Sequence, residues 1–160
     1  MELTVTSQRG LHAGQAIKGA ARGVITVLER YLAPLLDLGI RLWLAQVFFL
    51  SGLTKISSWD TTLSLFENEY QVPVLPPQVA AYADTFTELF FPLLLVLGLG
   101  TRFAAGVLFI FNIIAVISYP DLGEVGLKDH HYWGLLLLMP LLHGPGKISI
   151  DHFIRRRFWS

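Results

Sequence analysis

The chain has 160 residues, of which 53% are hydrophobic, and its mean hydropathy is +0.54. This composition leaves too little polar surface for a soluble domain of this size. The 12 Lys and Arg balance the 12 Asp and Glu, so the net charge favours no strongly charged partner, nucleic acid included. The absence of cysteine excludes disulfides, thiolate metal sites and cysteine nucleophiles.

Four apolar segments have about the length of a membrane span, since about 20 helical residues cross a hydrocarbon core of about 30 Å. They run approximately over Leu36–Thr54, Val79–Leu99, Arg102–Tyr119 and His130–Ile148, and the last is the weakest. The Gly98–Arg102 stretch between the second and third segments is typical of a tight turn, because glycine accepts the backbone angles that a turn needs. We therefore predict an all-α transmembrane four-helix bundle.

The basic residues favour one orientation. Nine of them precede the first span, lie in the turn between the second and third, or follow the last, whereas the opposite loops hold only Lys55 and Lys128. Cytoplasmic loops of membrane proteins carry the excess of Lys and Arg. We therefore expect a multi-pass protein of the bacterial cytoplasmic (inner) membrane with both termini in the cytoplasm.

The segments outside the spans also have patterns. Apolar residues recur at helical spacing from Ile17 to Leu32 with basic residues between them, which predicts an amphipathic helix on the membrane surface; a partly ordered basic tail is the alternative. We expect residues 1–35 to form this tail and helix, 36–148 the transmembrane domain, and 149–160 a basic cytoplasmic tail. The loop between the first two spans can form a short helix that caps the outer face.

Ionisable residues inside a span cost free energy and therefore suggest function. Asp84 and Glu88 are four residues apart and share a helix face, so they need a nearby cation or a shared proton. We predict an outward-facing pocket in which Asp84 and Glu88 are catalytic or handle protons. The expected ligand-binding residues are Arg41, Lys55, Asn112, His130 and His131. Arg41 is also explained by an ion pair with Asp37, and the adjacent histidines point to different faces, so no metal site is predicted.

Several of these residues occur in an order that resembles the DoxX family of small bacterial four-helix membrane proteins. The resemblance covers about Leu36 to His143. It rests on Arg41, Phe49, Gly52 and Lys55 in RLWLAQVFFLSGLTK, then Glu88, then LLLVLGLGTR ending at Arg102, and more loosely on His131-Tyr132-Trp133. It implies a link to membrane redox systems, such as the quinone-reducing subunit of a thiosulfate–quinone oxidoreductase. Other similar proteins accompany enzymes that make copper-binding modified peptides.

Three hypotheses follow. In the leading one, the chain belongs to a redox system and binds a quinone or another small lipophilic ligand, with Lys55 and Arg41 holding an anionic oxygen. A partner protein or a bound cofactor then carries the electrons, and quinone is the cofactor to expect. The second hypothesis is a transporter or channel for a small molecule, which homo-oligomerisation would assist. The third is a non-catalytic assembly factor or anchor for a biosynthetic enzyme.

Overall fold

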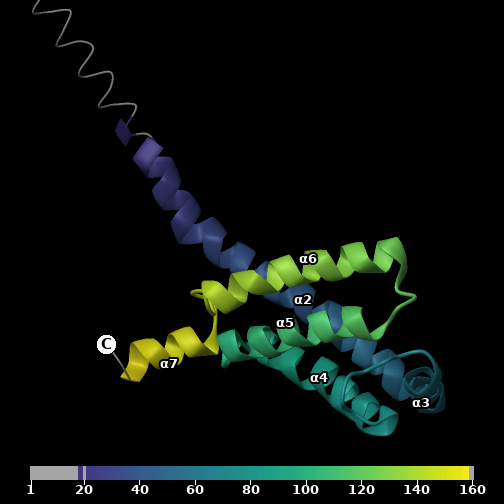
Figure 1. Cartoon of the computed structure of the whole chain (residues 1–160). Helices are drawn as coiled ribbons and strands as arrows, with labels where there is room; N and C mark the ends of the chain where they lie inside the picture. The colour runs from purple at the N-terminus through teal and green to yellow at the C-terminus, as the bar shows by residue number, and fades with distance from the viewer. Residues whose placement is uncertain (1–17, 20, 159–160) are drawn as a thin grey trace, which may run out of the picture. The chain divides into compact units, whose positions relative to one another are not determined.

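The computed structural model describes residues 18, 19 and 21–158, and this part of the chain is helical with no strand. Its elements are η1 (Leu28–Leu32, a π-helix), α2 (Ala33–Ser57), α3 (Trp59–Asn68), α4 (Pro77–Leu97), α5 (Thr101–Ser118), α6 (Gly123–Leu142) and α7 (Ile150–Phe158) (Figure 1). The chain divides into two units, residues 1–36 and 37–160. The prediction of an all-α membrane bundle is confirmed.

The first unit is helical from Ala21 onward, and the π-helix η1 interrupts the α-helical pattern. Its large apolar side chains are exposed and recur at helical spacing, at Val24, Leu28, Leu32 and Leu36 among others. Residues 1–17 and 20, where the predicted amphipathic helix begins, lie outside the described residues. The described part is helical, and an amphipathic helix on a membrane surface stays a prediction.

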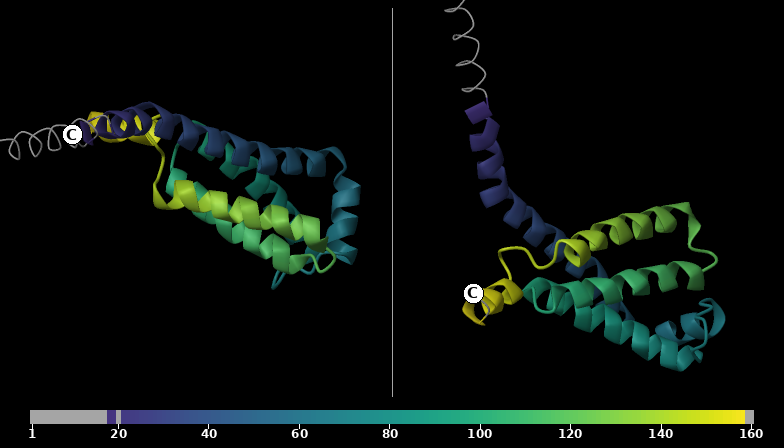
Figure 2. Two further views of the ribbon diagram at one scale, coloured as in Figure 1. Left: turned by 90° about the horizontal axis from the view of Figure 1, so that it is seen from above. Right: turned by 60° about the vertical axis from the view of Figure 1, so that its left-hand side comes forward.

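The second unit is a bundle of α2, α4, α5 and α6. Figure 2 shows α5 and α6 side by side, and their contact is the most extensive between two helices of the bundle. The buried core takes side chains from all four helices: Leu44, Ala45, Phe48, Leu95, Ala104, Ala105, Leu108 and Leu137. Many other large apolar side chains of these helices are exposed, as expected for helices surrounded by lipid.

The predicted glycine turn joins α4 to α5. Gly98 has φ +66° and Gly100 has φ +56°, both in the left-handed region. The amide of Leu99 donates to the carbonyl of Leu94, and that of Gly98 to the carbonyl of Leu95, which is a Schellman ending of α4. Only glycine takes up these angles without strain, so this turn is determined by local sequence.

Three described helices are long and apolar enough to cross a membrane: Ala21–Ser57, which includes α2, then α4 and α5. Helix α6 has 20 residues but is less apolar, because its first turns hold Glu124, Lys128 and Asp129. It begins seven residues earlier than expected, at Gly123, and ends at Leu142. Its role as a fourth span rests on its length and its packing along α5.

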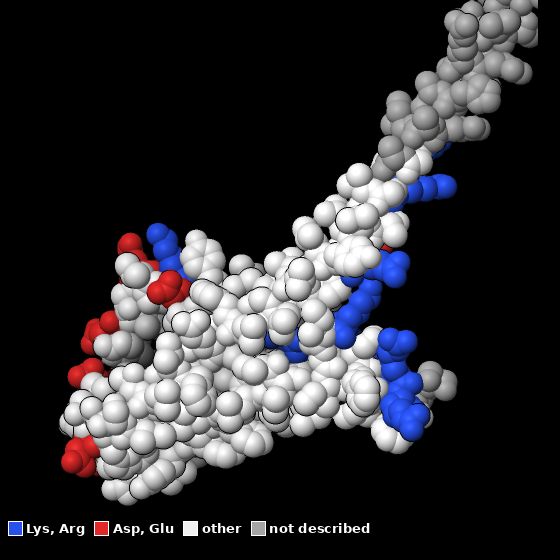
Figure 3. Space-filling view, turned by 180° about the vertical axis from the view of Figure 1, so that it is seen from behind, with Lys and Arg blue, Asp and Glu red and all other residues white. Residues whose placement is uncertain are grey.

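The second unit has two chemically different ends (Figure 3). We call the end that holds α3, the start of α4 and the start of α6 the acidic end; its exposed carboxylates include Glu67, Glu69, Asp121 and Glu124. We call the end that holds the α4–α5 turn and α7 the basic end, where Arg155, Arg156 and Arg157 are exposed. Lys128 is a basic exception at the acidic end.

Candidate functional site

The first site residue, Glu88, belongs to the buried stripe of α4. Ala81, Thr85, Glu88, Pro92 and Leu95 alternate at spacings of four and three, and all five are buried. This is the periodicity of a helix face that packs into a core. A carboxylate therefore occupies a position that normally holds an apolar residue.

Lys55 joins Glu88 and Asp84. Its Nζ donates a hydrogen bond to Oδ2 of Asp84 and lies 2.7 Å from Oε2 of Glu88, an ion pair with each carboxylate. The side chains of Lys55 and Asp84 are 17% exposed, and that of Glu88 is 6% exposed. We call these three residues the triad. It lies between α2 and α4 in the acidic half of the bundle.

Three residues next to the triad determine its packing and polarity. Gly52 allows α2 to approach α4, because a Cβ there would lie 2.9 Å from Cδ2 of Leu89 and 3.1 Å from Cβ of Glu88. One turn after Glu88, Pro92 has no N–H to donate to the Glu88 carbonyl, so the backbone is locally more polar beside the triad. Ser51, one turn before Lys55, also faces Glu88.

Helix α3 packs against the start of α4, and α3 and the segment after it are also joined to the ends of α2 and α5. The hydroxyl of Thr62 donates to the carbonyl of Lys55 at 3.1 Å, and the amide of Gln71 donates to the carbonyl of Ser118 at 2.7 Å. Tyr70 packs edge-on against Tyr119 at 5.1 Å between ring centroids. The sequence suggested a capping helix here, but it did not single out Tyr70.

Tyr70 is electrostatically linked to the triad. Its pKa is raised mainly by burial, and the opposing charge of Lys55 lowers it by a smaller amount, while Asp84 raises it further. The phenol therefore stays protonated at neutral pH and remains a hydrogen-bond donor. An aromatic residue within a Pro-flanked loop was the available sequence signal, and it was too weak to single out Tyr70.

Two buried hydroxyls in this half of the bundle, Oγ1 of Thr85 and Oγ of Ser118, have no hydrogen-bond partner among the described residues. A buried polar group without a partner costs about 1–3 kcal/mol. Such a cost is usually offset by an ordered water or by a polar atom of a ligand. These two hydroxyls are therefore available to form hydrogen bonds with a polar ligand or a water molecule.

Asn112 and His130 form a separate pair. Nδ2 of Asn112 donates to the carbonyl of His130 at 2.9 Å, and its Oδ1 lies 2.8 Å from Nδ1 of the same histidine. The His130 ring also contacts Trp133, with centroids 4.7 Å apart. These bonds connect α5 with α6, whereas the triad connects α2 with α4. His131 is exposed and takes part in neither group. The residues that we expected in one pocket therefore form two separately bonded clusters.

Arg41 lies at the basic end, 14 residues and thus about 21 Å along α2 from Lys55. It is 1% exposed, and its guanidinium donates to the carbonyl of Leu95 at 3.2 Å and to the carbonyl of Ile148. Asp37, expected as its ion-pair partner, acts on Arg41 through its charge, but these hydrogen bonds go to backbone carbonyls. Arg41 therefore lies away from the triad and ties α2 to the chain before α7.

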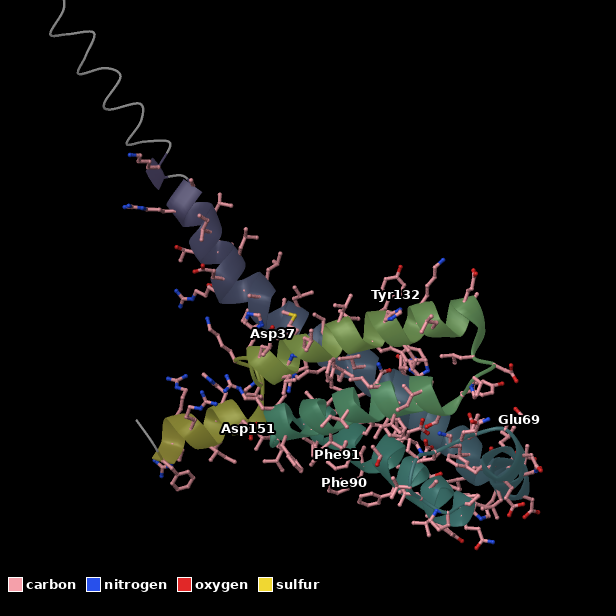
Figure 4. The ribbon with its side chains drawn as sticks, viewed as in Figure 1. Asp37, Glu69, Phe90, Phe91, Tyr132 and Asp151 are labelled. Carbon is pink, nitrogen blue, oxygen red and sulfur yellow. The ribbon has the colours of Figure 1, made fainter. Side chains whose placement is uncertain are left out.

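Glu69 marks the acidic end in Figure 4, and Asp37 and Asp151 both mark the basic end. The carboxylate of Asp151 accepts hydrogen bonds from the amides of Gly100 and Thr101, at 2.9 Å each. A carboxylate at a helix N-terminus satisfies free amides and complements the helix dipole. The polar residues at this end thus hold the fold together.

The chain is similar in sequence to known proteins. The sequence model of the DoxX family matches residues 36–120, a range that includes Arg41, the triad and Asn112. An uncharacterized protein of Haemophilus influenzae is 31% identical, over 73% of this chain and 82% of that relative. No solved structure matches the chain significantly.

Proposed function

Because the chain belongs to the DoxX family, we propose that it is a bilayer-embedded component of a membrane redox system and binds a quinone-like molecule at the triad. The observation that carries this proposal is the buried cluster of Lys55, Asp84 and Glu88. The family suggests the redox context, and the triad suggests the place and the polarity of the ligand.

The charges of the triad do not balance. One lysine faces two carboxylates, so the fully ionised cluster has a net charge of −1 among apolar helices. A lysine that only links two helices needs one carboxylate as its partner. A second buried carboxylate adds an excess charge, which costs free energy. The excess is relieved when one carboxyl holds a proton or when a ligand brings a hydrogen-bond donor.

The hydrogen-bonding capacity of the triad therefore selects a type of ligand head group. Two carboxylates offer four acceptor oxygens, and Oε2 of Glu88 has no hydrogen-bond partner among the described residues although it forms an ion pair with Lys55. The Lys55 ammonium has three protons, one of which it donates to Asp84. Ring hydroxyls fill the spare acceptors, and a ring oxygen accepts a remaining lysine proton. A hydroxylated aromatic ring, such as the reduced form of a quinone, meets both requirements.

The surroundings suit a ligand that enters from the lipid. Leu53 and Ile56 on α2 and Phe86 and Phe90 on α4 are exposed large apolar side chains close in sequence to the triad. The rings of Phe86 and Phe90 stack with centroids 5.1 Å apart. An aromatic head with an apolar tail would thus keep its tail in hydrocarbon while its head reaches Lys55.

A bound quinone supplies two-electron, two-proton redox chemistry. The residues of this chain would hold the ring oxygens through Lys55 and Tyr70, and Glu88 and Asp84 would take up or release protons at their carboxyl oxygens. Electrons would come from or go to a partner protein, since no cysteine is present to carry them.

The basic end faces the cytoplasm in this proposal. Arg102, Lys147 and the arginines of α7 lie at that end, and Lys128 is an exception at the other. The triad would then lie in the outer half of the bacterial cytoplasmic membrane. In the cysteine-free chain, a single cysteine at Val74 should react with an impermeant thiol reagent in intact cells, and one at Lys147, an exposed position at the basic end, should not.

The test of ligand binding uses the full chain in lipid nanodiscs. Lipid extracted from the purified protein should contain quinone, and a short-chain quinol should bind more tightly than its dimethyl ether, which cannot donate hydrogen bonds. Glu88→Gln should abolish binding and any activity of the redox system. Glu124→Gln, which changes an exposed carboxylate of the acidic end, is the matched control and should leave both unchanged.

Two results would overturn the proposal. Quinone-free protein that binds neither ligand would leave the triad as a connection between helices, the role of an assembly factor or anchor. Full activity of Glu88→Gln would show that the carboxylate of Glu88 takes no part in the reaction. Substrate flux in liposomes without quinone binding would instead favour the transporter hypothesis.

A further inference from the structure

The C-terminal helix α7 is a separate feature that the proposed function leaves unexplained. Its local sequence specifies a short, well-capped helix. Oγ of Ser149 accepts the amide of His152 at 3.1 Å, which is an N-cap bond. Asp151 lies in the first turn and three arginines lie in the last, so both ends complement the helix dipole.

Helix α7 is fixed to the bundle at its first turn. The amide of Asp151 donates to the carbonyl of Gly98 at 2.9 Å, and its carboxylate accepts the amides of Gly100 and Thr101. Just before the helix, the carbonyl of Ile148 accepts a hydrogen bond from Arg41. The helix therefore begins at the level of the α4–α5 turn, where both spans end.

The exposed faces of α7 differ in chemistry. Ile150, Phe153, Ile154 and Phe158 recur at spacings of three and four and thus share one face. Phe153 is 71% exposed and Phe158 is 74% exposed, so this face is not covered by the bundle. Arg155 and Arg156 lie on other faces. Arg157 lies within the apolar face, where its long stem lets the guanidinium reach outward.

We propose that α7 lies on an anionic phospholipid surface, with Phe153 and Phe158 inserted among the acyl chains and the three arginines at the lipid phosphates. An exposed apolar face beside a cluster of arginines matches the two layers of such an interface. The attachment to the α4–α5 turn places the helix at the level where a bilayer that surrounds α4 and α5 has its headgroups. Each basic side chain near an anionic surface favours binding by about fivefold, so three favour it by about a hundredfold.

The experiment uses the full chain with one introduced cysteine, because the native sequence has none. An environment-sensitive fluorophore on Ile154→Cys reports whether the apolar face is in lipid, and lipids with a quencher in the acyl chain confirm its depth. The protein is placed in nanodiscs of phosphatidylcholine alone or mixed with phosphatidylglycerol. The same fluorophore on Val74→Cys, a fully exposed position at the acidic end, is the reference.

We expect blue-shifted emission and strong quenching at position 154 in the anionic nanodiscs, and a docking equilibrium constant up to about a hundredfold larger than in phosphatidylcholine. Replacement of Arg155, Arg156 and Arg157 by glutamine should abolish the difference, and replacement by lysine should keep it. The Val74 reference should not respond to lipid charge. Equal signals in both lipids, or a glutamine variant that docks like the native chain, would overturn the proposal. A label in water in every lipid would also overturn it.

Discussion

Lys55→Met should be the most destabilising single substitution within the triad. It leaves Asp84 and Glu88 without their shared cation, although their side chains are only 17% and 6% exposed. Removal of one partner from a buried ion pair costs about 3–5 kcal/mol. Since Lys55 and Asp84 retain some exposure, we expect the lower part of that range, a loss of about 3 kcal/mol in the free energy of unfolding.

Asp84→Asn should behave differently, because it leaves one lysine facing one carboxylate and removes the excess charge. We expect its free energy of unfolding to stay within about 1 kcal/mol of the native value. The combination Lys55→Met, Asp84→Asn and Glu88→Gln leaves no formal charge, and it should regain at least half of the loss caused by Lys55→Met alone.

The assay is reversible unfolding in mixed micelles by titration with sodium dodecyl sulfate, followed by far-UV circular dichroism. The native chain and the three variants are compared at one pH and one lipid composition. If Lys55→Met costs no more than Asp84→Asn, or if the triple variant is less stable than Lys55→Met, the charges of the triad do not govern its energetics and our reasoning is wrong.

Three further predictions use the same micelles. Gly52→Ala should unfold more easily than Gly106→Ala by about 1–3 kcal/mol, because the new methyl at position 52 meets α4 at 2.9 Å and the one at position 106 meets its nearest neighbour at 3.5 Å; equal stabilities would contradict the close packing. Arg41→Met loses charged hydrogen bonds worth about 1.5–3 kcal/mol each, so amide hydrogen exchange across α7 should accelerate, and unchanged protection would refute its tethering role. Asn112→Leu leaves the polar groups of His130 without their partners, at a cost of about 1–3 kcal/mol in the titration, and a neutral effect would argue against the α5–α6 bridge.

The helices and turns that are determined by residues close together in the sequence were predictable. The apolar stretches determine helices because a backbone in hydrocarbon must satisfy its own hydrogen bonds. Gly98 and Gly100 determine the turn because other residues rarely adopt their angles. The expected spans therefore agree with α2, α4 and α5 to within a few residues. For α6 the charged start misled the prediction, since a helix that packs along a neighbour tolerates charges at its end.

The pairing of the two carboxylates in the triad was predictable, but the identity of their cation was not. A shared face for Asp84 and Glu88 follows from their spacing, and the need for a cation follows from the cost of burial. The choice of Lys55 over His130 or His131 depends on which helix lies beside α4, and the absence of a side chain at Gly52 permits that contact.

The sequence by itself determined a membrane bundle with carboxylates inside it, because hydropathy and helical spacing act over a few turns. Only the tertiary structure decided that the polar residues separate into the triad, the Asn112–His130 bridge and the Arg41 tie. Such pairings join residues dozens of positions apart, and packing between helices, which local periodicity does not encode, selects them.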